Sequence, residues 1–120
     1  MKRCIYLDNA ATTKTRPEVV DAMLPYFTEF YGNPSSVYEF SNESKKAINR
    51  SRETIADAIG AKTNEIYFTA GGTESDNWAL AATAEAYQAK GNHIITSKIE
   101  HHAVLHTCEY LEKRGFEVTY

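Results

Sequence analysis

Cysteine is scarce in this chain of 120 residues: Cys4 and Cys108 are its two cysteines, they lie far apart, and no CxxC spacing occurs. Two such residues define neither a metal site nor a disulfide framework. Both are predicted to be small, buried or half-buried hydrophobic residues. A nucleophilic role for Cys108 is the less favoured interpretation, because a reactive thiol needs an exposed, electropositive setting that the sequence does not indicate.

Long apolar runs and a surplus of basic charge are also missing. No run of about 18 apolar residues could span a bilayer, and the apolar run near the amino terminus is too short for a secretory signal, so a cytoplasmic protein is predicted. The 13 basic and 16 acidic residues are mixed along the chain and give a net charge of -3. This pattern argues against nucleic acid as a partner.

The sequence does contain strand-like and helix-like segments in regular order. Pro25 interrupts a helical pattern and is expected to kink that helix or remove one of its hydrogen bonds. Gly60, Gly91 and Gly115 are stop signals for later helices. In chain order the predicted elements are a strand at 4–7, helices at 17–30 and 41–59, a strand at 66–69, a helix at 73–90, a strand at 93–97, a helix at 103–114 and a strand at 116–120.

The order of these elements predicts the fold class. Strand and helix alternate after residue 60 at the spacing of crossover units on a parallel sheet. We therefore predict an α/β fold with a mainly parallel sheet flanked by helices, in which residues 1–60 form an N-terminal segment of a short strand and helices. Residues 61–120 would form the first βα units of an incomplete domain, because the chain stops within a predicted strand.

The turn at residues 69–75 joins a predicted strand to a predicted helix, so exposed N–H groups and the positive end of the helix dipole suit an anion there. Gly71 and Gly72 let the backbone approach a phosphate, and the Thr73 hydroxyl can donate a further bond. The pattern is neither GxGxxG nor a P-loop, so dinucleotides and nucleoside triphosphates are not indicated. A ligand-free capping box formed by Thr73 and Asp76 is an equally favoured interpretation of the turn alone.

Four strings carry a resemblance to a known family: YLDNAATT at residues 6–13, GNPSS at 32–36, FTAGGTESDN at 68–77 and EHHAVL at 100–105. They occur in the order found in cysteine desulfurases of the class V aminotransferase group, which the chain resembles over essentially its whole length. Relatives often follow the second string with histidine and later glycine, whereas this chain has Tyr38 and Ser41.

The resemblance implies part of the large domain of a pyridoxal-phosphate (PLP) enzyme of fold type I. Such an enzyme takes sulfur from L-cysteine, leaves L-alanine and holds the sulfur as a persulfide. Carried over by motif, Gly72 and Thr73 hold the cofactor phosphate, and His101 stacks on the pyridine ring and shuttles protons. Without the resemblance, His101 would be interpreted as a helix cap or a surface group. The resemblance also implies a homodimer and, as partner, a sulfur acceptor or iron–sulfur scaffold protein.

Other parts of the family's machinery have no counterpart in these residues. The motifs of the Schiff-base lysine, of the aspartate that pairs with the pyridine nitrogen and of the loop cysteine are missing, and Lys98 is interpreted as a surface lysine. The chain is therefore expected to be the N-terminal part of a longer enzyme and inactive by itself. A selenocysteine lyase, another class V aminotransferase or lyase, and a noncatalytic phosphate-binding module are the alternatives.

Overall fold

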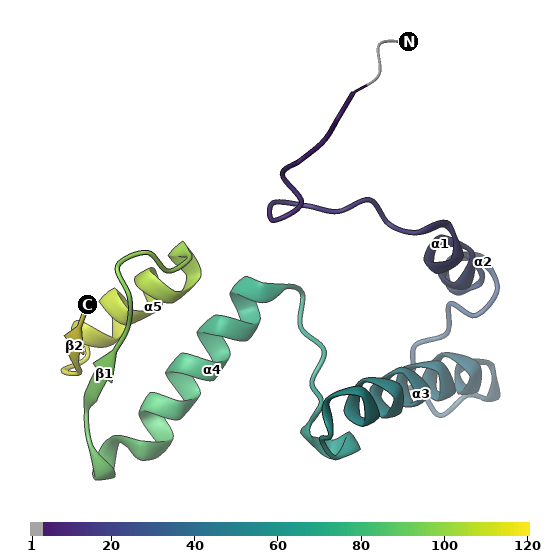
Figure 1. Ribbon diagram of the computed structural model, residues 1–120. Coiled ribbons are helices and arrows are strands. Elements are labelled where there is room, and N and C mark those ends of the chain that lie inside the picture. The colour runs from purple at the N-terminus through teal and green to yellow at the C-terminus, as the bar shows by residue number, and fades with distance from the viewer. Residues whose placement is uncertain (1–3) are drawn as a thin grey trace. The chain divides into compact units, whose positions relative to one another are not determined.

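The computed structural model describes residues 4–120 and divides them into two compact units, one ending at Ile66 and the other running from Tyr67 to Tyr120. Figure 1 shows the helices and strands of each unit. Over the residues described, no helix is both long enough and apolar enough to cross a membrane.

The first unit is helical. It contains α1 (Pro17–Met23), α2 (Pro25–Thr28) and α3 (Asn42–Ile59), with 3-10 turns at Glu39–Ser41 and Thr63–Glu65. The predicted interruption at Pro25 is confirmed: this proline occupies the first position of α2, where its missing N–H is not needed. The predicted end of the helix at 41–59 is also confirmed, because Gly60 follows α3 with a left-handed φ of 69°.

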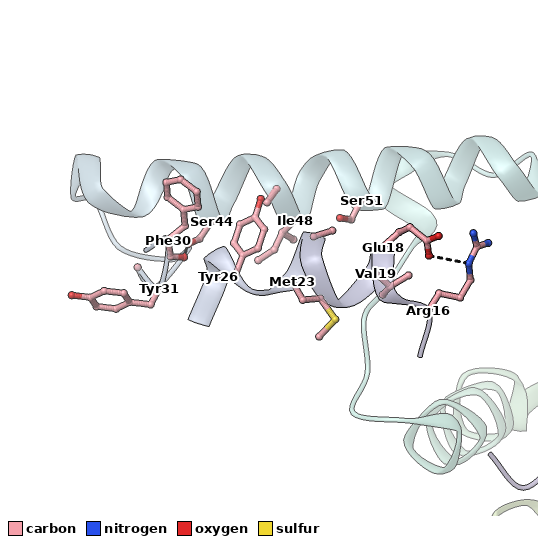
Figure 2. A pocket seen from close by; sticks show the side chains of 13 residues that line it. Arg16, Glu18, Val19, Met23, Tyr26, Phe30, Tyr31, Ser44, Ile48 and Ser51 are labelled. Carbon is pink, nitrogen blue, oxygen red and sulfur yellow. Dashed lines mark hydrogen bonds and ion pairs between the residues drawn. The ribbon is translucent and has the colours of Figure 1, made fainter. Parts of the chain in front are cut away.

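A pocket of about 800 Å³ lies between α3 and the pair α1 and α2 (Figure 2). Its lining is mainly apolar and includes Met23, Tyr26 and Ile48. Ser44 joins its two sides, since the hydroxyl of this α3 residue donates a hydrogen bond to the carbonyl oxygen of Phe30 at 2.5 Å. The charged residues of its lining, Arg16 and Glu18, form an ion pair of 3.4 Å with each other (Figure 2), and we interpret the pocket as a packing feature.

The second unit is a β-α-β arrangement preceded by a long helix. Its elements are α4 (Gly72–Tyr87), a 3-10 turn (Gln88–Lys90), β1 (His93–Ile95), α5 (His102–Glu112) and β2 (Glu117–Thr119). The two strands pair in parallel, with Ile94 opposite Val118, and α5 is the crossover between them (Figure 1). Cys108, Leu111 and Phe116 are buried in this unit. The predicted α/β class, with parallel strands joined through a helix, is confirmed.

Two predicted strands and one predicted burial are wrong. Residues 4–7 and 66–69 are not strands in the structure, because a strand requires a ladder with a neighbour and β1 and β2 form the one sheet among residues 4–120. Cys4 is exposed, whereas Cys108 is buried as predicted. The apolar pattern of these segments identifies side chains suited to a sheet, and it cannot supply the partner strand.

Candidate functional site

Two helix N-termini of the second unit meet at one pocket. The start of α4 contributes Thr73 and Asn77, and the start of α5 contributes His101, to a pocket of about 500 Å³. The other residues that line it are Ala81, His102, Ala103, His106, Thr107 and Tyr110. Thr73 and His101 belong to separate sequence motifs, and the structure places both on this pocket. A second hollow, of about 700 Å³, is lined by the turn itself and shares Thr73 and Asn77 with the first.

The start of α4 is not the capping box that Thr73 and Asp76 allow. Gly71 is the N-cap, the helix begins at Gly72, and no side chain caps it. Thr73 is therefore the second residue of the helix instead of its cap, so the capping-box interpretation of this turn is wrong.

Side chains around the turn hold its shape in another way. The Glu74 carboxylate accepts a hydrogen bond from the N–H of Ala70 at 2.5 Å. The hydroxyls of Thr69 and Ser75 share a hydrogen bond of 2.7 Å across the turn. The backbone before α4 is thus fixed by its own neighbours, and the Glu74 carboxylate is engaged with a backbone donor.

The first turn of α4 keeps several hydrogen-bond donors available. Among the residues described, no acceptor is paired with the N–H groups of Gly72, Thr73 and Glu74 or with the Thr73 hydroxyl. These donors lie at the N-terminus of a helix of 16 residues, where the helix dipole favours negative charge. The geometry therefore fits an anionic group.

The two glycines of the turn support the same conclusion. A Cβ atom placed on Gly71 or Gly72 would meet no other atom within 4 Å. Neither glycine has a φ in the left-handed region, so the backbone conformation does not require glycine. Packing and conformation inside the chain thus leave both glycines unexplained, whereas close approach of a bound group to the backbone explains them.

His101 is the N-cap of α5. Its Nδ1 accepts a hydrogen bond from the N–H of Ala103 at 3.1 Å. A ring nitrogen that accepts a bond carries no proton, so the neutral imidazole has its proton on Nε2. This cap fixes both the orientation and the tautomer of the ring.

Two further histidines follow on the same helix. The rings of His102 and His106 are stacked, with centroids 5.3 Å apart and planes inclined by 20°. Both line the pocket beside His101. Within residues 4–120, no group of three or more metal-ligating side chains is placed to hold a metal ion.

The remaining reactive candidates lie outside this arrangement. Lys98 is exposed, as expected of a surface lysine. Cys108 is fully buried, and this burial raises the pKa of its thiol, as does the Glu112 carboxylate, against a smaller lowering by a hydrogen bond with Thr96. A raised pKa leaves less thiolate at neutral pH, which counts against a nucleophilic role for Cys108.

Asn77 is the residue that sequence reasoning missed. It is part of the string at 68–77, and nothing in the pattern gives it a role of its own. In the structure its side chain reaches Thr107, which is 30 residues away along the chain. A contact of this separation is visible only once α4 and α5 are packed.

The fold and the site define an α/β protein in which the start of α4 keeps N–H donors of the kind that suit an anionic group. A solved NifS-like protein superposes with a TM-score of 0.91 at 40% identity, covering 97% of this chain and 32% of that one. A structure described as SspA in complex with cysteine gives a TM-score of 0.88 at 42% identity, covering 96% of this chain and 33% of that one.

The cysteine desulfurase IscS of Methanosarcina thermophila is 65% identical over 118 residues, which are 98% of this chain and 29% of that relative. The aminotransferase class-V family matches residues 5–120, and the chain belongs to this family. Its fold is that of part of the large domain of NifS-like enzymes of PLP fold type I, as the resemblance implied.

Proposed function

We propose that this chain is the N-terminal part of a PLP-dependent cysteine desulfurase, which takes sulfur from L-cysteine and leaves L-alanine and an enzyme persulfide. The observation that carries the proposal is that Thr73 and His101 line one pocket. Two similar proteins support this choice of substrate: the 65% identical relative is a cysteine desulfurase, and the SspA structure is a complex with cysteine. PLP would supply an electron sink for the carbanion character that develops on the substrate.

The start of α4 is the proposed phosphate site. Gly72 and Thr73 would bind the cofactor phosphate through their N–H groups and the Thr73 hydroxyl, which have no acceptor among residues 4–120. The absence of a Cβ at Gly71 and Gly72 leaves the backbone accessible. The helix dipole adds a favourable interaction with the phosphate charge.

His101 is the proposed stacking and proton-transfer residue. The hydrogen bond from Ala103 N–H to Nδ1 leaves the N–H group at Nε2 as the donor of the neutral ring. Uptake of a proton takes place at Nδ1 and requires this hydrogen bond to open. An imidazole changes its protonation near neutral pH, which suits a group that moves a proton to and from a substrate. The ring is held in one orientation by its own backbone as long as the hydrogen bond to Nδ1 is in place.

The rest of the proposal follows the family. The Schiff-base lysine, the aspartate and the loop cysteine would come from residues outside this sequence, so the 120 residues alone would be inactive. We further propose that the protein is a cytoplasmic homodimer. In each subunit, residues 1–60 would form an N-terminal segment and residues 61–120 the first βα units of the cofactor-binding domain. It would pass sulfur to an acceptor such as an iron–sulfur scaffold protein.

The test uses the full-length protein that carries this chain. Titration with PLP is expected to show binding that the Thr73→Ala substitution weakens by about 10- to 100-fold, because hydrogen bonds to charged groups contribute about 1.5–3 kcal/mol. Thr83→Ala, on the same helix but outside the site, is the matched control and should bind as the unmodified protein does.

The reaction itself separates the alternatives. With PLP and L-cysteine, the full-length protein should release alanine and sulfide. Release of selenium from L-selenocysteine without turnover of L-cysteine would identify a selenocysteine lyase instead. Binding of PLP without turnover of either amino acid would favour a noncatalytic module, and no PLP binding at all would refute the proposal.

A further inference from the structure

Asn77 lies between the two halves of the site and contacts both. With its amide nitrogen turned toward the surrounding oxygens, Nδ2 lies 2.7 Å from Thr107 Oγ1, 3.0 Å from the Ala103 carbonyl oxygen and 3.2 Å from the Thr73 carbonyl oxygen. The opposite orientation would set the amide oxygen against two carbonyl oxygens, so the orientation with three acceptors around the N–H₂ group is the favourable one.

Thr107 completes this network from α5. Its hydroxyl donates a hydrogen bond of 2.8 Å to the carbonyl oxygen of Ala103, one turn earlier in the same helix. Ala103 and Thr107 are 7% and 8% exposed, respectively. A buried polar group without a partner costs about 1–3 kcal/mol, so this cost applies to Thr107 and to the Ala103 carbonyl group. Asn77 itself is exposed and makes its hydrogen bonds at the edge of this buried pair.

The same few atoms connect Thr73 to His101. Asn77 binds the carbonyl oxygen of Thr73, whose N–H and hydroxyl are the proposed phosphate donors. It also binds the carbonyl oxygen of Ala103, whose N–H holds Nδ1 of His101. Thr73 and His101 are therefore connected by hydrogen bonds through only two intervening residues, Asn77 and Ala103.

We infer that Asn77, together with Thr107, is a positioning residue that fixes the N-terminus of α4 against the N-terminus of α5 and so sets the phosphate donors and the imidazole of His101 in one geometry. The inference rests on the proposed function for its purpose, because it assigns Asn77 to the site that binds PLP. Asn77 itself need not touch the cofactor.

Two isosteric substitutions test the network in the full-length protein. Asn77→Asp replaces the donating N–H₂ group with an acceptor that faces the carbonyl oxygens of Thr73 and Ala103. Thr107→Val removes the hydroxyl and keeps the shape, whereas Thr107→Ser keeps the hydroxyl. Each of the first two should raise the dissociation constant of PLP by about 5- to 10-fold, equivalent to about one hydrogen bond.

The matched control lies at the other end of the unit. Asn92 also joins distant parts of the second unit, since its Nδ2 donates to the carbonyl oxygen of Gly115 at 3.3 Å. Asn92→Asp therefore removes a comparable amide contact without touching the site. It should leave PLP binding within about twofold of the unmodified protein, as should Thr107→Ser.

A second measurement reports on His101 without the cofactor. Nitrogen-15 NMR of the imidazole distinguishes a ring with its proton on Nε2 from one that exchanges between tautomers. In the unmodified protein, in Asn92→Asp and in Thr107→Ser, His101 should hold the Nε2 proton. In Asn77→Asp and Thr107→Val, whose Ala103 backbone is released, the ring should populate both tautomers.

The possible outcomes separate this inference from the proposed function. Weaker PLP binding and a mixed tautomer in Asn77→Asp and Thr107→Val alone would support the positioning role. If Asn92→Asp changes both measurements equally, Asn77 contributes only general stability and the inference is wrong. If the unmodified protein does not bind PLP, the proposed function fails, and the state of the His101 ring still decides whether Asn77 positions it.

Discussion

Replacing Gly32 with alanine should destabilise the first unit by about 1–2 kcal/mol, for a steric reason that the structure states directly. A Cβ atom on Gly32 would lie 2.9 Å from both the carbonyl oxygen of Phe40 and the Cα of Ser41, and 3.0 Å from Cδ1 of Phe40. Contacts between nonbonded carbon atoms are favourable at about 3.5–4.0 Å. The two nearest atoms belong to the backbone, so a change of rotamer cannot relieve the overlap.

The magnitude follows from two opposing effects. Overpacking of a tight contact costs about 1–3 kcal/mol. Alanine also restricts the unfolded chain, which stabilises the folded state by about 0.4–1 kcal/mol wherever the native φ suits it. Gly32 is not among the glycines with a positive φ, so this gain applies and reduces the net cost of the substitution.

Hydrogen–deuterium exchange of the full-length protein measures the effect where it arises. Amides over residues 30–44 should exchange about 5- to 30-fold faster in Gly32→Ala, the factor that corresponds to one or two kcal/mol. Gly91→Ala is the control, because its Cβ would meet no atom within 4 Å. Equal exchange in the two variants would refute the steric argument, and so would an effect of Gly32→Ala spread evenly over the whole protein.

Two further predictions concern the chain as a whole and its cysteines. The 120 residues expressed alone should bind a hydrophobic dye and aggregate, because large apolar side chains such as Val37, Ile99 and Leu7 are 96%, 94% and 84% exposed; sharp, dispersed amide NMR signals would contradict this. In the native full-length protein, an alkylating reagent at neutral pH should modify Cys108 much more slowly than it does in denaturant, because the folded thiol is buried with a raised pKa; equal rates under the two conditions would show that this burial is absent. The folded state binds the thiol proton more tightly than the unfolded state, so this group makes the free energy of unfolding fall as the pH rises above the ordinary thiol pKa. In denaturant unfolding at two alkaline pH values, Cys108→Ala should therefore lose less stability between the two pH values than the unmodified protein does.

Local chemistry made much of the fold predictable. Pro25 and Gly60 act on their own backbone, and the helix boundaries they predict are found within a residue. The strand at 93–97 is shorter in the structure, His93–Ile95, and the segments at 4–7 and 66–69 have no strand pairing. A helix satisfies its hydrogen bonds internally, whereas a strand depends on another segment, so strand predictions fail where helix predictions succeed.

The site residues show the same difference between local signals, which the sequence contains, and contacts with distant residues, which it does not. Gly72, Thr73 and His101 could be selected from the sequence because each lies in a short motif at a helix start. Asn77 could not, because its importance comes from a partner 30 residues away. The capping-box pattern at Thr73 and Asp76 failed for a different reason: Gly71 starts the helix two residues earlier, and a glycine N-cap leaves no side-chain signal.

The structure also changes how the two interpretations of His101 relate to each other. A helix cap and a proton-transfer residue were alternatives at the level of sequence, and the structure shows that His101 is a cap. A cap that uses Nδ1 as the acceptor orients the ring and leaves the proton of the neutral ring on Nε2, and it occupies the nitrogen at which the neutral ring would take up a proton. The two roles are therefore linked through Nδ1: the cap orients the His101 ring, and uptake of a proton by that ring requires the hydrogen bond from Ala103 N–H to open.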